Sequence, residues 1–178
     1  MLEWLLNILG WNVRGLNDPD RRDTVHETIA SSSCQIVCLQ ETKLSSVSSF
    51  DAVYIGGNRL RGYAERPANG TRGGILLLWD DSLMQLSDVQ LSEFCLSAKI
   101  HFLNSNGEND FKITTVYGPT ASSRKDDFFA ELIEHKPLNG WGKLRKALQR
   151  DSSGNPDAWV KCANSRAHGQ EKRGPNND

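Results

Sequence analysis

The feature of this sequence that most constrains its fold is a pair of apolar segments separated by a helix-like segment within the first 40 residues. Residues 7–13 and 35–40 are apolar runs of strand length. Residues 20–31 between them carry Val25 and Ile29 about one helical turn apart, with acidic residues in the first turn. A strand, a helix and a strand within about 30 residues form a right-handed βαβ unit with parallel strands. We therefore predict an α/β core that begins with this unit.

The rest of the folded part is predicted to be rich in strands and to end in a helix. Turn signals separate the apolar segments, notably at Asn69-Gly70 and at residues 104–107. Ser123 and Asp126 form a capping-box-like start for a helix over residues 124–134. Its expected apolar face consists of Phe128, Phe129, Leu132 and Ile133. Five further strands are expected, over residues 62–66, 74–80, 84–91, 94–103 and 111–117. The predicted fold class is α/β, an α+β sandwich with a mostly antiparallel sheet.

The charge of the chain changes along its length and divides the chain into three parts. The 178 residues carry a net charge of −1, but residues 1–134 hold 12 Lys and Arg against 18 Asp and Glu. Residues 135–150 hold five cations and no acids, and their apolar spacing allows a helix. Only six of the 28 residues from 151 to 178 are apolar, too few to offset the entropy lost on ordering. We predict a folded domain, a short basic segment and a disordered tail over these three ranges.

Nothing in the sequence predicts a membrane or secreted setting. No run of 18 apolar residues is present, and the apolar start carries Glu3 and no cation before Arg14, unlike a signal peptide. Four cysteines are few for a disulfide scaffold in a chain of this size. Residues 70–74 lack the Gly-Lys-Ser/Thr ending of a phosphate-binding loop, and no small-molecule cofactor is evident. We expect an intracellular protein without a membrane partner.

Polar residues stand at the ends of three predicted strands. Asn12 ends the first strand, Glu41 follows the second, and Tyr117 ends the strand over residues 111–117. Because the carboxyl ends of the strands in a βαβ unit open on one edge of the sheet, Asn12 and Glu41 are expected in one crevice. A carboxylate beside an amide suits Mg²⁺, which takes one or two carboxylates and keeps several waters. The Tyr117 phenol can donate a hydrogen bond to an anion at the same edge.

Four segments carry more information together than any one of them alone. In order they are Trp11-Asn12-Val13-Arg14-Gly15-Leu16-Asn17, Leu39-Gln40-Glu41-Thr42-Lys43, Gly73-Gly74-Ile75 and Val116-Tyr117-Gly118-Pro119. Their order and spacing resemble the endonuclease/exonuclease/phosphatase superfamily, and most closely the endonuclease domain of plant-type non-LTR (LINE) retrotransposons. The resemblance covers about residues 7–134. It implies a truncated four-layer, DNase I-like sandwich and a divalent-metal-dependent phosphodiesterase that uses Mg²⁺ or Mn²⁺.

The resemblance also implies roles for individual residues. Glu41 matches the family's metal-binding glutamate, and Asn12 matches the asparagine beside it that helps to position metal and phosphate. Tyr117 matches the tyrosine that hydrogen-bonds the scissile phosphate. Arg14 stands where the abasic-site repair relatives usually carry Asp, which favours the retroelement branch. That branch implies DNA as the partner and the nucleus as the location.

Two later segments that the family requires are missing. Neither a Gly-Asp-Phe-Asn segment after the tyrosine nor a Ser-Asp-His segment near the end is present, and His168 follows Ala167 rather than Asp. The chain thus supplies a metal anchor and a phosphate donor but no general base. Because positioned general acid–base catalysis contributes about 10² to 10⁴ in rate, we expect a truncated domain that is close to inert alone.

The candidate nucleic-acid-binding residues are basic side chains in or near the matching motifs. They are Arg14, Lys43, Arg59, Arg61, Arg66 and Arg72. The last four form a local basic cluster that can contact DNA phosphates, although a solvated arginine-rich hairpin explains it equally well. The net charge of −6 over residues 1–134 argues against strong nonspecific binding. His101 is expected to be a poor catalytic candidate, because no carboxylate is predicted beside it.

The leading interpretation is a fragment of a DNA-nicking endonuclease domain with an incomplete catalytic set. One alternative is a non-catalytic remnant that binds nucleic acid or protein, whose salt-sensitive DNA binding would survive loss of the Glu41 carboxylate. Another is a phosphatase-type member of the same superfamily, which would act on sugar, lipid or nucleotide phosphates. A screen of substrates separates the second alternative from the leading interpretation.

Overall fold

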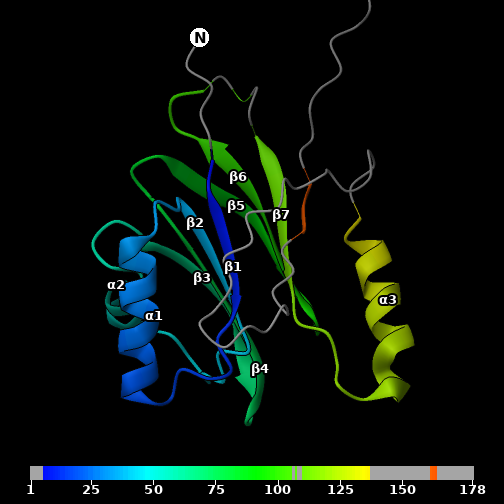
Figure 1. Cartoon of the computed structure of the whole chain (residues 1–178). Coiled ribbons are helices and arrows are strands. Elements are labelled where there is room, and N and C mark those ends of the chain that lie inside the picture. The colour runs from blue at the N-terminus through cyan, green and yellow to red at the C-terminus, as the bar shows by residue number, and fades with distance from the viewer. Residues whose placement is uncertain (1–5, 106, 108–109, 137–160, 164–178) are drawn as a thin grey trace, which may run out of the picture.

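The computed structural model describes residues 6–105, 107 and 110–136 and, as backbone only, residues 161–163. The described strands form two four-stranded sheets, in the orders β1-β2-β4-β3 and β5-β6-β7-β8 (Figure 1). The elements in chain order are β1 (Ile8–Asn12), α1 (Pro19–Ser31), β2 (Ile36–Gln40), α2 (Ser49–Gly56), β3 (Gly62–Asn69), β4 (Arg72–Trp79), β5 (Met84–Leu91), β6 (Cys95–Phe102), β7 (Phe111–Val116), a 3₁₀ turn (Ser122–Arg124), α3 (Lys125–Glu134) and β8 (Lys161–Ala163).

The elements pack in four layers around two hydrophobic cores. One core lies between the first sheet and helices α1 and α2, and it includes Val37 and Ile29. The other lies between the two sheets and includes Cys38 of β2 and Ile100 of β6. Figure 1 shows α1 and α2 on one side of the sheets and α3 on the other. Only β1 and β2 pair in parallel among the described strands. This arrangement confirms the predicted α+β sandwich with mostly antiparallel sheets.

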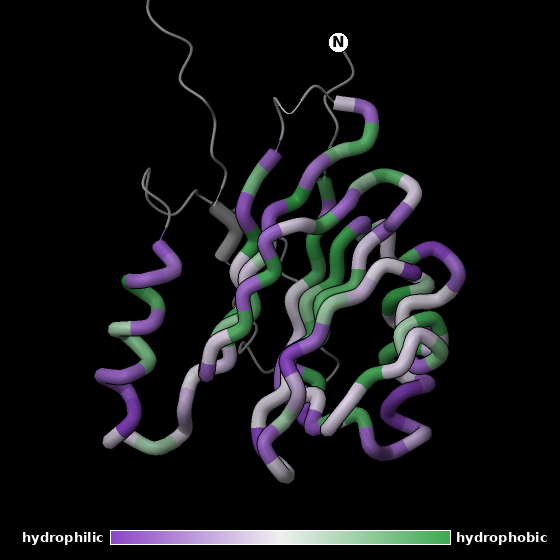
Figure 2. Tube along the Cα trace, turned by 180° about the vertical axis from the view of Figure 1, so that it is seen from behind, coloured by the Kyte–Doolittle hydropathy of each residue, from purple (hydrophilic) through white to green (hydrophobic). Residues whose placement is uncertain are grey.

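The central strands are apolar throughout because both of their faces are covered. All five residues of β2 are buried. Val37 and Leu39 pack toward the helices, whereas Ile36 and Cys38 pack into the core between the sheets. Figure 2 shows apolar residues concentrated along these central strands. The unbroken apolar run that predicted a buried strand therefore has a direct cause in the layered packing.

The first two helices begin at side-chain caps. The Asp18 carboxylate accepts a hydrogen bond from the Asp20 N–H at 3.0 Å, and Pro19 follows it at the start of α1. Helix α2 is an addition to the predicted elements. It begins with a capping box in which the Ser48 hydroxyl accepts from the Asp51 N–H while the Asp51 carboxylate accepts from the Ser48 N–H. The two helices lie side by side over the first sheet.

Helix α3 forms where it was predicted, but the predicted capping box does not. No side-chain cap is made at its start, and the 3₁₀ turn leads into the helix instead. The Arg124 guanidinium bonds Asp127 at 3.1 Å and Glu93 at 2.7 Å. The apolar face is also only partly covered. Phe128 packs edge-on against Phe94 with ring centres 5.5 Å apart, while the other apolar residues of α3 include two that are exposed: Phe129 by 55% and Ile133 by 71%.

The strand predictions for residues 62–117 are confirmed, with changed ends. β3 and β4 pair as far as Asn69 and Arg72, so the hairpin is longer than predicted on both sides of its turn. The basic segment predicted over 135–150 and the tail predicted over 151–178 lie outside the described residues, apart from residues 135–136 and β8. β8 pairs with β7 in antiparallel fashion, so three residues of the predicted tail add a strand to the second sheet.

Candidate functional site

The ends of β1, β2 and β7 meet at one edge of the sandwich, which we call the rim and define by Asn12, Glu41 and Tyr117. Asn12 is in register with Gln40 across the parallel β1–β2 pair, and Glu41 follows directly. Tyr117 follows the last residue of β7, and its N–H donates to the Phe94 carbonyl at 2.8 Å. The parallel pairing therefore places Asn12 and Glu41 at the same edge, as the βαβ unit predicted.

A hydrogen bond between the two sheets aligns the rim. The Gln40 side-chain amide donates to the Val116 carbonyl at 2.8 Å, although the two residues are 76 positions apart in the sequence. Gln40 precedes Glu41 and Val116 precedes Tyr117, so this bond fixes the spacing between the two strand ends that carry them. Gln40 is 4% exposed, which protects the bond from competition with water. Sequence reasoning missed this residue, because a glutamine at a strand end carries no sign of a partner in another sheet.

The backbone at the rim is held in an uncommon conformation. Arg14, Glu41 and Lys43 have φ angles of 54°, 56° and 57°, in the left-handed region that residues other than glycine rarely adopt. Each such residue costs on the order of 1–3 kcal/mol and persists only where its surroundings impose it. The surroundings here include the N–H groups of Thr42 and Lys43, which donate to the carbonyls of β4. This strain is concentrated in the two loops that carry the rim residues.

Two glycines allow β4 to approach the Glu41 loop. The Thr42 N–H donates to the Gly74 carbonyl at 3.2 Å, and the Lys43 N–H donates to the Gly73 carbonyl at 3.0 Å. A Cβ on Gly74 would overlap the Thr42 hydroxyl, and a Cβ on Gly73 would lie 3.5 Å from the Tyr117 ring. The paired glycines of the third motif thus pack between the Glu41 loop and Tyr117.

Burial, with a smaller contribution from nearby charge, favours the protonated phenol of Tyr117. Burial raises the pKa of Tyr117 above its ordinary value of 10.0, the nearby Glu41 carboxylate raises it further, and Arg72 opposes the change. A protonated phenol is a hydrogen-bond donor, which is the state that an anionic ligand requires. The same effect shows that Glu41, Arg72 and Tyr117 are close enough to interact electrostatically.

The donor atoms at the rim fit a hard divalent cation. The Glu41 side chain is 22% exposed and its Oε1 lies 3.4 Å from Lys43 Nζ. The Asn12 Oδ1 accepts from the Arg14 N–H at 3.1 Å, so this amide presents its oxygen within the rim loops. One carboxylate and one amide oxygen, with water completing the shell, are the ligands that Mg²⁺ or Mn²⁺ takes. Within residues 6–105, 107 and 110–136, no group of three metal-ligating side chains gathers at the rim.

The arginines expected to form one cluster are divided between the two ends of the sheet. Arg72 lies beside the rim glycines, and the Arg66 guanidinium donates to the Ser92 carbonyl at 2.7 Å. Arg59 instead binds the carbonyls of residues 32 and 34, before β2 begins. Arg61 pairs with Asp81 at 3.3 Å and precedes Gly62, which is in register with Trp79. The antiparallel hairpin separates the four side chains, so the prediction of a single cluster is wrong.

The expectation that His101 has no carboxylate partner is also wrong. Its Nδ1 lies 2.6 Å from the Asp110 carboxylate, and its Nε2 lies 2.6 Å from the Ser87 hydroxyl. Asp110 reaches His101 because the chain turns back between β6 and β7. Sequence reasoning missed Asp110 because this residue lies outside the predicted strand over residues 94–103, in the connection between β6 and β7.

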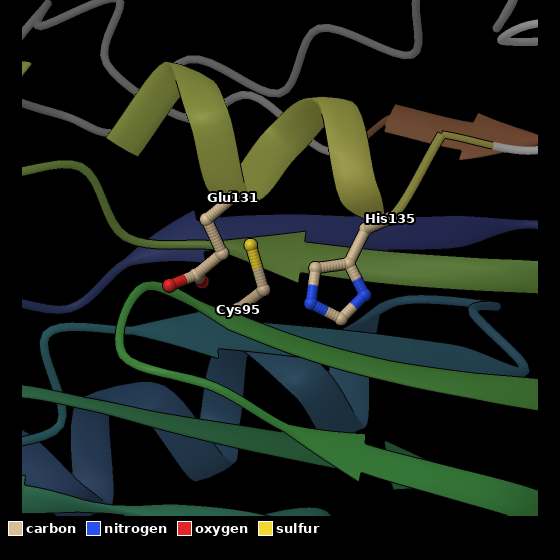
Figure 3. Close-up of side chains that lie close together, drawn as sticks. All are labelled: Cys95, Glu131 and His135. Carbon is tan, nitrogen blue, oxygen red and sulfur yellow. The ribbon is translucent and has the colours of Figure 1, made fainter. Parts of the chain in front are cut away.

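A second polar cluster lies between the second sheet and α3, beside the strand end that carries Tyr117. Cys95 at the start of β6, Glu131 in α3 and His135 directly after α3 point toward one another (Figure 3). Their ligand atoms all lie within 4.8 Å of one another, and Cys95 and His135 are buried. They form a group that can hold a metal ion. Sequence reasoning missed it because Cys95 and His135 are 40 residues apart, although the spacing of Glu131 and His135 by four is a usable signal for one helical face.

Comparison with known proteins agrees with the fold and with the resemblance to the superfamily. The chain matches the Endonuclease/Exonuclease/phosphatase family over residues 9–159. It belongs to this family, and the match extends beyond residue 134, where the resemblance was expected to end. No curated protein sequence matches the chain significantly.

Among solved structures, the chain is similar to a humanized D. rerio TDP2 that carries 14 mutations. The TM-score is 0.52 at 17% sequence identity, with 73% of this chain and 54% of that chain covered. The chain therefore spans about half the length of this structural neighbour, and the likeness supports the four-layer fold. In the described part of the chain, no helix has the length and apolar character needed to cross a membrane.

Proposed function

We propose that this chain is part of a divalent-metal-dependent endonuclease domain of the retroelement type, whose reaction is the nicking of a DNA strand at a phosphodiester. The observation that carries the proposal is the placement of Asn12, Glu41 and Tyr117 at one edge of the sandwich, where the bond from Gln40 to Val116 joins the strand ends before Glu41 and Tyr117. A carboxylate and a protonated phenol in one place suit a metal ion and a phosphate, respectively. A protein of this type acts in the nucleus, which is the location that we propose.

Each rim residue has a distinct task in this proposal. Glu41 and Asn12 would hold Mg²⁺ or Mn²⁺, which when bound stabilises charge that develops on the phosphate. Tyr117 donates its hydroxyl proton in a hydrogen bond to a phosphate oxygen. Lys43, 3.4 Å from Glu41, neutralises the carboxylate when no cation is bound and contacts phosphate when one is. Arg14 and Arg72 add positive charge at the same edge.

We also propose that the chain alone cleaves DNA very slowly. The sequence lacks the family's Gly-Asp-Phe-Asn and Ser-Asp-His segments, which would supply the acid and imidazole that activate water. Loss of positioned proton transfer lowers a rate by about 10² to 10⁴, and catalytic groups that act as a unit lose most of their effect together. The rim then retains binding of metal and phosphate without efficient hydrolysis.

The test combines metal binding with plasmid nicking. We expect Mn²⁺ binding, measured by electron paramagnetic resonance, that is lost in Glu41→Ala and kept in Glu27→Ala, a matched change at an exposed position of α1. We expect nicking of supercoiled plasmid near background in Mg²⁺ for all three proteins. Mn²⁺ binding that is absent, or unaffected by Glu41→Ala, contradicts the metal site. Fast nicking that Glu41→Ala abolishes contradicts the proposed inactivity and leaves the metal site supported.

A second candidate is a non-catalytic remnant that binds nucleic acid or protein. It is favoured by the positive charge of Arg14, Lys43 and Arg72 at one edge. This function predicts salt-sensitive DNA binding that survives Glu41→Ala and weakens in Arg72→Ala. A phosphatase-type activity on small phosphate esters is the third candidate, and a screen of such esters with Mg²⁺ tests it directly.

A further inference from the structure

We propose that Cys95, Glu131 and His135 form a zinc site that fastens the C-terminal end of α3 to the second sheet. This site adjoins the strand end that carries Tyr117 but shares no residue with the rim, and the proposal does not rest on the proposed function. The ligand atoms of the three side chains all lie within 4.8 Å of one another, which small side-chain rotations convert into the spacing around one ion. Figure 3 shows the three side chains converging from β6 and α3.

The local structure explains why these residues converge. Glu131 lies in the last turn of α3, and His135 caps the helix with helical backbone angles, so the two side chains, four positions apart, lie on the same side. Cys95 is the first residue of β6, and the Phe94 N–H before it donates to the Glu131 carboxylate at 2.8 Å. The edge-on packing of Phe128 against Phe94 holds the preceding turn of the helix against the same strand. The arrangement is therefore fixed by contacts on both sides of the cluster.

The chemistry of the donor set selects zinc over the hard cations suited to the rim. A thiolate, an imidazole nitrogen and a carboxylate oxygen are all ligands that Zn²⁺ accepts, and three protein ligands leave a fourth position for water. A thiolate disfavours Mg²⁺ and Ca²⁺, which prefer oxygen. Binding releases the thiol proton to solvent and forms the sulfur–zinc bond. Burial, together with the Glu131 carboxylate, raises the pKa of the Cys95 thiol to about 12, so the thiol keeps its proton until a cation displaces it.

Hydrogen bonds around the cluster orient the histidine. His135 Nδ1 lies 3.1 Å from the Ser97 hydroxyl, which is itself 2.8 Å from the Thr114 hydroxyl in a buried position. His135 Nε2 lies 2.9 Å from the Ser92 hydroxyl, which donates to Glu131 at 2.7 Å. Because Ser92 gives its one proton to Glu131, Nε2–H donates to Ser92 when no ion is bound, and Nδ1 accepts from Ser97. Binding of the ion through Nε2 requires the other tautomer, in which Nδ1–H donates to Ser97 and the Nε2 lone pair is free. Such outer contacts on the second nitrogen are the usual support of a metal-binding histidine.

The site accounts for how α3 is held. No residue within α3 is buried, and its packing onto the sandwich is otherwise limited. His135, directly after the helix, is only 9% exposed and contacts the second sheet through Ser97. An ion bound by one strand residue and two residues of the helix end would join the two elements directly. The consequence is that zinc raises the free energy of unfolding by RT ln(1 + [Zn²⁺]/Kd), where [Zn²⁺] is the free zinc concentration.

The experiment titrates the full chain with Zn²⁺ and with Co²⁺ as a spectroscopic probe. We expect one equivalent of Co²⁺ to give a thiolate-to-metal charge-transfer band and tetrahedral visible bands, and Zn²⁺ to displace it and raise the melting temperature. Cys95→Ser and His135→Gln should remove the band, and Ser97→Ala should weaken binding by roughly 10- to 100-fold. Cys34→Ser, at a partly exposed cysteine away from α3, is the matched control and should leave binding unchanged.

The wild-type result alone can overturn the proposal. Absence of the charge-transfer band, or a band that survives Cys95→Ser, contradicts it. If Cys95→Ser does not fold, the near-isosteric Glu131→Gln replaces it, since its amide oxygen can still accept the hydrogen bonds that the carboxylate accepts. Retention of full affinity in Glu131→Gln then counts against the site. Glu41→Ala should keep the band, which separates failure of this proposal from failure of the rim proposal.

Discussion

The side chain of Gln40 donates a hydrogen bond of 2.8 Å to the main-chain carbonyl of Val116, and so joins the two sheets one residue before Glu41 and Tyr117. The remaining contacts between the sheets described here are mainly apolar packing, which is not directional. A directional bond at this position sets how the strand ends face each other. This polar contact therefore helps to position the rim at the edge of an apolar core.

Replacement of Gln40 by leucine should destabilise the chain and loosen the rim. The change removes this donor from the part-buried Val116 carbonyl, which costs about 0.5–1.5 kcal/mol in the free energy of unfolding. Denaturant titration of the wild type and the variant measures the difference. Gln85→Leu, at an exposed position of β5, is the control and should change stability little. A Gln40→Leu protein as stable as the wild type would show that the bond between the sheets is dispensable.

A methyl group at Gly74 should disturb the Glu41 loop. Its φ of +86° already disfavours alanine by about 1–2 kcal/mol, and overlap with the Thr42 hydroxyl adds a further ~1–3 kcal/mol. Gly70→Ala isolates the first contribution, because Gly70 has a φ of +60° and open space around it. We expect Gly74→Ala to lower the unfolding free energy clearly more than Gly70→Ala does. Equal losses would mean that the loop moves aside without cost.

The sequence predicts the architecture well where burial dictates residue type. The strands around Val37 and Leu77 are apolar because both faces are covered, and a run of such residues has no other ready explanation in a soluble domain. The convergence of Asn12 and Glu41 follows from one rule, that parallel strands of a βαβ unit end at the same edge. Local rules and one topological rule thus suffice for two of the three rim residues.

What the sequence does not predict depends on contacts between distant segments. The partner of Gln40 lies in the other sheet, and Cys95 meets His135 only because α3 folds back over β6. Arg59 and Arg66 are close in sequence yet lie toward opposite ends of an antiparallel strand pair. Such relationships require the register and the packing of the sheets, which hydrophobic patterning leaves open.

The exposed apolar residues of α3 should promote association. Phe129 and Ile133 are 55% and 71% exposed and lie one helical turn apart, so they form a small apolar patch on the outer face of the helix. The double change Phe129→Ser and Ile133→Ser should lower binding of a hydrophobic dye and raise solubility while changing the unfolding free energy by under about 1 kcal/mol. Dye fluorescence and light scattering measure the effect. Unchanged dye binding would mean that the dye binds apolar surface other than that of Phe129 and Ile133.

The ionisation of Tyr117 reports directly on the geometry of the rim. Burial and the Glu41 carboxylate raise the pKa of Tyr117 above 10.0, and Arg72 lowers it. Glu41→Gln should therefore move the Tyr117 step in an ultraviolet pH titration to lower pH, and Arg72→Gln should move it to higher pH. Since the chain has three tyrosines, Tyr117→Phe identifies which step belongs to Tyr117. If neither change moves the titration step of Tyr117, the side chains of Glu41 and Arg72 lie too far from Tyr117 to affect its ionisation.

The same shift predicts how stability depends on alkaline pH. Above pH 10.0 the unfolded chain releases the Tyr117 proton while the folded chain still retains it, so the unfolded state is favoured as pH rises through that range. The free energy of unfolding should fall with pH more steeply for the wild type than for Tyr117→Phe. Below pH 10.0 this difference in slope should vanish, because the phenol is protonated in both states. Parallel slopes above pH 10.0 would mean that Tyr117 is as accessible in the folded chain as in the unfolded one, and that the rim does not enclose it.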